Sequence, residues 1–236
     1  MRHPIALPFL LLLPPTLAFA TLTPFHDDGP MDNAERLLEQ GRRAFRDDTF
    51  GDEAFWSDAL GLHRSIAGIA NGGVGPGLSP RTALALGLQV DQDRLDGRTQ
   101  SQLRRGRIDL DDAATTLALL QQNAIVGVRG TFDGGGHLTQ VGVTCALCHS
   151  TVDDSFAPGI GHRRDGWPNR ALDVGTIIAF APDLQPIARA LQTTPETVRT
   201  VLASWGPGKF DAHLLLDGRA FRPDGGSAAV LIPAAF

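Results

Sequence analysis

The chain has 236 residues, with 21 lysines and arginines against 26 aspartates and glutamates, so its formal net charge is −5. This acidic balance argues against nucleic acid and against an anionic membrane surface as the binding partner. The length predicts one domain or two small ones, and the 27 glycines and 16 prolines predict many loops.

The first twenty residues have the pattern of a secretory signal peptide. Arg2 and His3 precede an apolar stretch from Ile5 to Phe19, and Ala18-Phe19-Ala20 is a small-residue cleavage site. An uncleaved membrane anchor is the alternative, but the stretch is shorter than the roughly 20 apolar residues of a span and contains prolines. We therefore expect residues 1–20 to be removed and the mature protein, which has no membrane span, to be periplasmic.

Helices dominate the secondary structure expected for the rest of the chain. A disordered mature N-terminus at 21–31 precedes a helix that Asp32 or Asn33 caps and that runs to about Phe45. Serine or threonine before proline starts helices at Ser79 and Thr194. The other expected elements are helices at about 50–69, 109–122 and 169–181, one short strand at 124–128, and an exposed connector at 91–107.

Both cysteines of the chain lie in one stretch, Cys145-Ala146-Leu147-Cys148-His149. C-x-x-C-H is the attachment signature of a c-type haem. The two thiols form thioethers with the vinyl groups of haem, and the imidazole that follows binds the iron as proximal ligand. The motif therefore predicts one covalent haem c, attached through Cys145 and Cys148 and ligated by His149.

Three other uses of a C-x-x-C pair compete with haem attachment. A zinc site needs a second cysteine pair or two histidines at ligand spacing, and the chain has no further cysteine. A thioredoxin-like redox pair sits beside a βαβ pattern and needs no following histidine. A structural disulfide is the third alternative. The histidine and the predicted export favour haem attachment over all three.

The motif resembles that of c-type cytochromes, and Gly41-Arg42-Arg43-Ala44-Phe45 is similar to the Gly-x-x-x-aromatic of their N-terminal helix. Here that helix lies about a hundred residues before the motif rather than directly before it. The resemblance implies a mainly α, cytochrome c-like helical haem domain over residues 32–236, with an extended helical insert at about 71–130 and many loops. The stretch from Gly41 to Phe236 is also loosely similar to the N-terminal part of longer bacterial di-haem peroxidase-like cytochrome c proteins.

The same resemblance implies roles for residues after the motif. In c-type cytochromes a Gly/Pro loop follows, and its proline carbonyl accepts a hydrogen bond from the proximal imidazole; this role is assigned to Pro158. Arg163 and Trp167 would hold the haem propionates through charge-assisted and indole N–H bonds. A solvated basic turn is the alternative for these two residues.

The sixth iron ligand is left open by the sequence. Small electron-carrying cytochromes place a methionine after the motif, but the two methionines here are Met1 and Met31. His162 is a possible sixth ligand because it lies nearest to the motif. The other possibilities are an open position or one of three other histidines, His63, His137 and His213.

Three functions are compatible with these observations. The first is a periplasmic electron carrier that exchanges electrons with a redox partner protein. The second is a haem enzyme of peroxidase-like type with an open or displaceable sixth position. The third is a truncated or regulatory haem protein, which the apolar end from Val230 to Phe236 suggests.

Overall fold

The structure is a computed structural model that describes residues 29–211 and 229–235. The chain divides into residues 1–38 and a compact unit of residues 39–236 that contains the cysteine motif. The expected signal peptide and most of the expected disordered N-terminus, 21–31, lie outside the described residues. Within the described ranges, no helix has the length and apolarity needed to cross a membrane.

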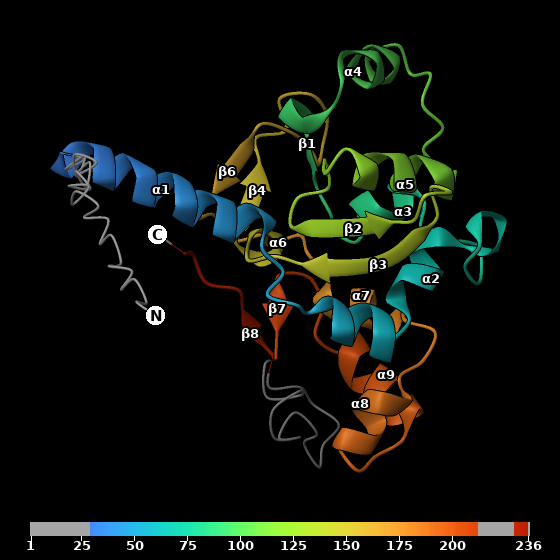
Figure 1. The fold of residues 1–236 in the computed structure, drawn as a ribbon. Coiled ribbons are helices and arrows are strands. Elements are labelled where there is room, and N and C mark those ends of the chain that lie inside the picture. Colours follow the sequence, from blue (N-terminus) through green and yellow to red (C-terminus); the bar gives the residue numbers. More distant parts are fainter. Residues whose placement is uncertain (1–28, 212–228, 236) are drawn as a thin grey trace, which may run out of the picture. The chain divides into compact units, whose positions relative to one another are not determined.

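Helices make up most of the regular structure (Figure 1). The α-helices are α1 (Pro30–Asp47), α2 (Leu62–Ala67), α3 (Pro80–Ala85), α4 (Gly97–Arg104), α5 (Ala113–Gln121), α6 (Ala146–His149), α7 (Val174–Ala179), α8 (Gln185–Ala190) and α9 (Pro195–Ala203). A π-helix, η1 (Ala54–Ala59), and two 3-10 turns, η2 (Ile69–Asn71) and η3 (Gln92–Arg94), complete the helical elements.

Strands form four two-stranded sheets within the described chain. They are β1 (Val90–Asp91), β2 (Val128–Phe132), β3 (Leu138–Val143), β4 (Ser150–Val152), β5 (Ile160–Gly161), β6 (Arg163–Asp165), β7 (Lys209–Phe210) and β8 (Val230–Leu231). β1 and β5 are parallel, whereas β2–β3, β4–β6 and β7–β8 are antiparallel. The fold is therefore helix-rich but mixed, and the mainly α expectation is met only in part.

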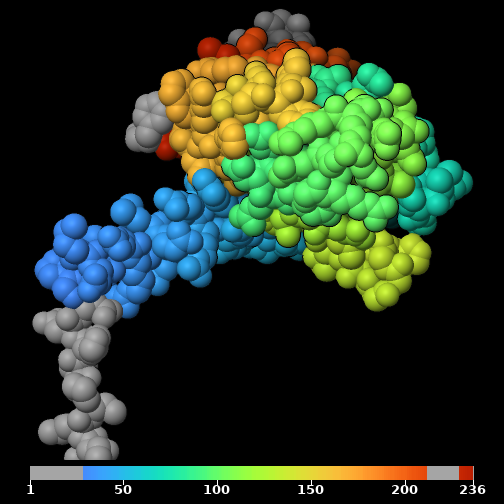
Figure 2. Space-filling model, turned by 90° about the horizontal axis from the view of Figure 1, so that it is seen from above, coloured from blue at the N-terminus to red at the C-terminus, as the bar shows by residue number. Residues whose placement is uncertain are grey.

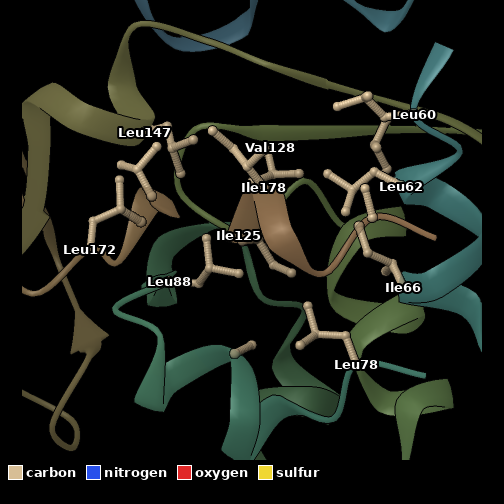
Figure 3. Close-up of a cluster of buried hydrophobic side chains, with 14 of the residues drawn as sticks. Leu60, Leu62, Ile66, Leu78, Leu88, Ile125, Val128, Leu147, Leu172 and Ile178 are labelled. Carbon is tan, nitrogen blue, oxygen red and sulfur yellow. The ribbon is translucent and has the colours of Figure 1, made fainter. Parts of the chain in front are cut away.

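The core brings together residues from almost the whole of the compact unit (Figure 3). Leu60, Leu172 and Ile178 are fully buried, and Leu147 of the motif points into the same cluster. Residues 71–130, which the sequence predicted as an insert, supply a large share of this cluster, including Leu78, Leu88, Leu120 and Ile125. This region is therefore part of the core and not an appendage on it.

Local capping signals gave the correct helix starts at Ser79 and Thr194. The side chains of Ser79 and Thr194 accept hydrogen bonds from Thr82 N and Thr197 N. The helix expected up to Phe45 is present as α1, but it begins at Pro30, so the caps expected at Asp32 or Asn33 are wrong, and Pro30 and Met31 are helical and not disordered. The helix expected at 50–69 is instead broken, because Gly61 has a left-handed φ of 66° between η1 and α2. The stretch 91–107, expected as an exposed connector, is mostly exposed or half-buried, but it contains η3 and α4, which Asp96 caps through Thr99 N.

The backbone of the cysteine motif passes close to Gly127, just before β2. Gly127 has a φ of 74°, and a Cβ built there would lie 2.0 Å from Leu147 N and 2.2 Å from Leu147 Cα. Only glycine satisfies both the left-handed conformation and this contact. The motif helix therefore depends on a glycine that lies eighteen or more residues before its cysteines.

Gly127→Ala is expected to destabilise the protein by about 3 kcal/mol or more, because it adds left-handed strain to a clash with the backbone of α6. Gly134→Ala is the matched control: it lies in the β2–β3 turn, where a Cβ would have nothing within 4 Å. Urea unfolding measures both. Equal stability of the two variants would show that α6 does not pack on Gly127.

Candidate functional site

The cysteine motif forms α6, a helix of only four residues that follows Cys145. A helix this short is not stable alone, because the conformational entropy lost in forming the first turn exceeds the free energy gained from its hydrogen bond. Backbone hydrogen bonds from other elements hold its two ends: Thr144 N donates to Gly127 O at 2.9 Å, and Gly166 N donates to His149 O at 2.8 Å. Asn169 N donates to Cys148 O at 2.9 Å. The motif is thus fixed by the chain before and after it.

Burial separates the two sides of α6. Ala146 and Leu147 are buried, whereas Cys145 is exposed and Cys148 half-buried. Phe45, at the end of α1, packs on Ala146 together with Val126 and Val152. The aromatic of the Gly-x-x-x-aromatic pattern therefore does support the motif helix.

The glycine of that pattern has no comparable role in the described chain. A Cβ on Gly41 would have no described atom within 4 Å. Gly41 therefore does not admit a second helix there, and the similarity to the N-terminal helix of c-type cytochromes does not extend to helix packing.

The two thiols of the motif are free and chemically unequal. Burial raises the pKa of the Cys148 thiol to about 11, with a smaller contribution from the nearby Cys145. Cys145 lies at the surface, where solvent and reagents reach it. One helical turn therefore carries an exposed thiol, Cys145, and a half-buried thiol, Cys148.

His149 is held by the C-terminal segment. Its Nδ1 lies 3.0 Å from the carbonyl oxygen of Pro233. A carbonyl oxygen only accepts, so Nδ1 carries the proton and donates, and Nε2 keeps its lone pair. This is the state in which an imidazole binds a metal through Nε2.

The acceptor for His149 is therefore Pro233, and the assignment of this bond to Pro158 is corrected. Pro158 is exposed in the turn where Ala157 and Ile160 pair. Pro233 reaches His149 because β8 pairs with β7, and because Ala235 N donates to Gly166 O at 2.9 Å.

Arg163 and Trp167 differ in exposure: the Arg163 side chain is buried, and Trp167 is exposed. Arg163 on β6 points inward: its side chain is 2% exposed, and its Nε lies 3.2 Å from Oδ2 of the equally buried Asp91. None of its three guanidinium nitrogens makes a hydrogen bond to another residue of the ranges 29–211 and 229–235. Trp167 is 55% exposed and directly follows Gly166, which bonds the carbonyl of His149.

His162 is occupied on both ring nitrogens. Its Nδ1 lies 2.9 Å from a carboxylate oxygen of Asp93, and its Nε2 lies 2.6 Å from the side-chain nitrogen of Gln92. The bond to Asp93 raises the pKa of this imidazole. A role as sixth iron ligand stays a prediction, and it would require His162 to leave these partners.

The three other candidate ligands lie in different parts of the chain: His63, His137 and His213. His137 lies exposed in the β2–β3 turn, with Nδ1 3.2 Å from Asp133. His63 lies on α2, where burial is the main cause of its lowered pKa. His213 lies outside the described residues.

The donors of the motif do not converge on one point. In residues 29–211 and 229–235 no group of three or more His, Cys, Asp and Glu side chains is placed to hold one metal ion. A zinc site needs such convergence. Haem attachment does not, because the sulfurs bond to the porphyrin edge while the imidazole binds the iron. The two free thiols and the oriented His149 fit haem c in this sense.

Comparison with known proteins gives no relative for this chain. No family model matches it, and neither a curated protein nor a solved structure does.

The two thiols are expected to react at different rates in protein made without haem attachment. At pH 8.5 iodoacetamide should label Cys145 first, because a pKa raised from 9.0 to about 11 leaves Cys148 about a hundredfold less thiolate than an unperturbed thiol. Peptide mass spectrometry after timed quenching measures the two rates. In urea the rates should become similar; preferential labelling of Cys148 in the folded protein would contradict the arrangement.

Proposed function

We propose that this protein is an exported c-type cytochrome that binds one covalent haem through Cys145 and Cys148 and carries electrons in the periplasm. The observation that carries the proposal is the state of His149. Its Nδ1 is tied to a backbone carbonyl, its Nε2 keeps a free lone pair, and two free thiols lie on the same turn. This combination is what haem attachment requires: two thiols for thioethers and an imidazole whose Nε2 can bind iron.

Each residue of the motif has a separate task in this proposal. Cys145 and Cys148 supply the sulfurs of two thioethers, and His149 supplies the proximal nitrogen. Pro233 keeps the ring oriented and raises its basicity by accepting the Nδ1 proton. Bound haem supplies an iron that cycles between the ferric and ferrous states. A mono-haem carrier needs little else from the chain except a haem edge near the surface.

Arg163 suits the propionate role predicted from the sequence. Buried N–H groups without acceptors are costly, so a guanidinium with unbonded nitrogens calls for an anionic partner in addition to Asp91. Arg163 pairs in register with Val152, three residues after His149. At about 3.3 Å per residue, that is roughly 10 Å of extended chain. We propose that a haem propionate supplies this second carboxylate.

The spin state of the ferric protein distinguishes the carrier from the enzyme. A carrier is expected to show six-coordinate, low-spin haem in the electron paramagnetic resonance spectrum, reversible reduction and no peroxide turnover. A high-spin spectrum together with oxidation of a reducing dye by peroxide would instead establish the peroxidase-like alternative, because it requires an open sixth position.

Loss of the Pro233 carbonyl is expected to raise the midpoint potential. Ending the chain at Ile232 keeps that buried residue but removes the acceptor for His149. A less basic imidazole stabilises ferric iron less. A tenfold change in the ratio of the affinities of the imidazole for ferric and ferrous iron corresponds to about 60 mV for one electron. We therefore expect the midpoint potential to rise by this order in a redox titration.

Pro158→Ala is the control for this prediction, because Pro158 is exposed and does not bond His149. Its midpoint potential should equal that of the unaltered protein. An unchanged midpoint potential in the chain ended at Ile232, or an equal shift in Pro158→Ala, would show that the Pro233 carbonyl does not tune the iron.

A further inference from the structure

A cavity of about 40 Å³ lies inside the core, where α2, α5, α6 and the β2–β3 hairpin meet. Fourteen residues line this inner cavity, and thirteen of them have apolar side chains. Figure 3 shows Ile66, Leu88, Ile125 and Leu147 among them, with their side chains directed into the same part of the core. Because Leu147 belongs to the cysteine motif, the inner cavity adjoins α6.

The wall of the inner cavity offers nothing for a hydrogen bond. Thr116 on α5 is the one lining residue with a polar side chain, and its hydroxyl is buried without a partner in the ranges 29–211 and 229–235. No polar atom of these ranges is exposed to the cavity. A buried water needs about two to four hydrogen bonds, so this wall favours a nonpolar occupant over water.

The volume of the inner cavity sets the size of that occupant. A single water-sized atom takes roughly 10–15 Å³, so a cavity of about 40 Å³ holds about three such atoms. An engineered apolar cavity that holds benzene measures roughly 150 Å³. The inner cavity therefore suits a xenon atom or a diatomic gas and is too small for an aromatic ring.

One side of the inner cavity lies near the surface. Its rim is formed by Leu86, Val143, Ile177 and Phe180, which are half-buried, whereas the ten other lining residues are buried. Rotation of these four side chains, three of which belong to α7 or to the turn after α3, would admit a small molecule.

A second apolar cavity of about 30 Å³ lies under α4 and α5, which form the green part of the surface in Figure 2. Leu88, Thr116 and Ile125 line both cavities, so the two adjoin. In this outer cavity four of fifteen lining residues have polar side chains, against one of fourteen in the inner cavity. The inner cavity is therefore the better match for a nonpolar molecule.

We infer that the inner cavity binds a small nonpolar molecule of the size of dioxygen. The occupant gains dispersion contacts with side chains that otherwise face a gap. The wall supplies no charge, donor or acceptor within the described chain, so selection is by size and polarity. The site uses neither the thiols nor His149, and it therefore does not depend on the haem proposal.

Xenon is the probe, and methanol, a polar molecule of two heavy atoms, is its control. Titration of the reduced full chain with dissolved xenon, followed by methyl ¹H–¹³C shifts, should show saturable binding with a dissociation constant in the millimolar range. The shifts should centre on Ile66, Leu88 and Leu147. Methanol should give no saturable shifts there at the same concentrations, because its hydroxyl would lose its hydrogen bonds to water.

Val128→Ile should weaken xenon binding about tenfold, because the added methyl group occupies much of the inner cavity. Val201→Ile is the matched control and should change the affinity less than about twofold, since Val201 is buried on α9 and does not line the inner cavity. Circular dichroism checks that both variants fold. Val143→Ile, on the half-buried rim, is the second filling variant and should also weaken binding.

Thr116→Val distinguishes a nonpolar site from a hydrated one. It removes the unbonded hydroxyl with little change of shape, so xenon affinity should change less than about twofold. A tenfold gain would show that water bound to Thr116 fills the cavity. That gain, equal effects of Val128→Ile and Val201→Ile, saturable binding of methanol, or the absence of saturable xenon shifts would each overturn the inference.

Discussion

The four residues of α6 cannot hold a helical turn on their own, and the candidate site therefore depends on contacts that fix this turn from outside. Gly127 lies against the backbone of Leu147 from one direction. Gly166 and Asn169 bond the carbonyls of His149 and Cys148 from the other. These contacts involve backbone atoms, and the one at Gly127 requires the absence of a side chain, so together they set the direction of α6. The thiols and the imidazole then take their positions from the helix.

The small sheets bring distant parts of the chain to the motif. The β2–β3 hairpin delivers the chain to Cys145, and β4 carries it away into a pair with β6. Arg46 reinforces this pair through Asp165 at 2.6 Å, and Ser150 donates to the same carboxylate. β7 and β8 place Pro233 beside His149. A two-stranded sheet is only marginally stable on its own in water. Each sheet here is therefore stabilised by the helical core that it covers.

Sequence reasoning succeeded where the cause of the structure is local. Ser79 and Thr194 start helices because a serine or threonine before proline caps a helix without help from elsewhere. It failed where the cause lies far along the chain. Gly87, with a φ of 78°, is a local stop signal for α3, but its contact with the backbone of Ala171 comes from tertiary structure, and nothing near Gly87 in sequence announces this neighbour.

The same distinction holds for the site. Cys145, Cys148 and His149 are adjacent in sequence, so their grouping was visible from the motif alone. The acceptor for His149 was not, because Pro233 lies 84 residues later and reaches it only through tertiary structure. Pro158 was the nearer choice in sequence. The inward direction of Arg163 also follows from the register of β4 and β6, which composition does not reveal.

The most direct test of the account is the mass of the protein matured in a cell that attaches c-type haem. The account predicts a mass equal to the chain plus one haem, with the added mass on the peptide that contains both Cys145 and Cys148 and resistant to acid–acetone extraction. A mass equal to the chain alone, with the cysteines as free thiols or joined as a disulfide, would contradict it.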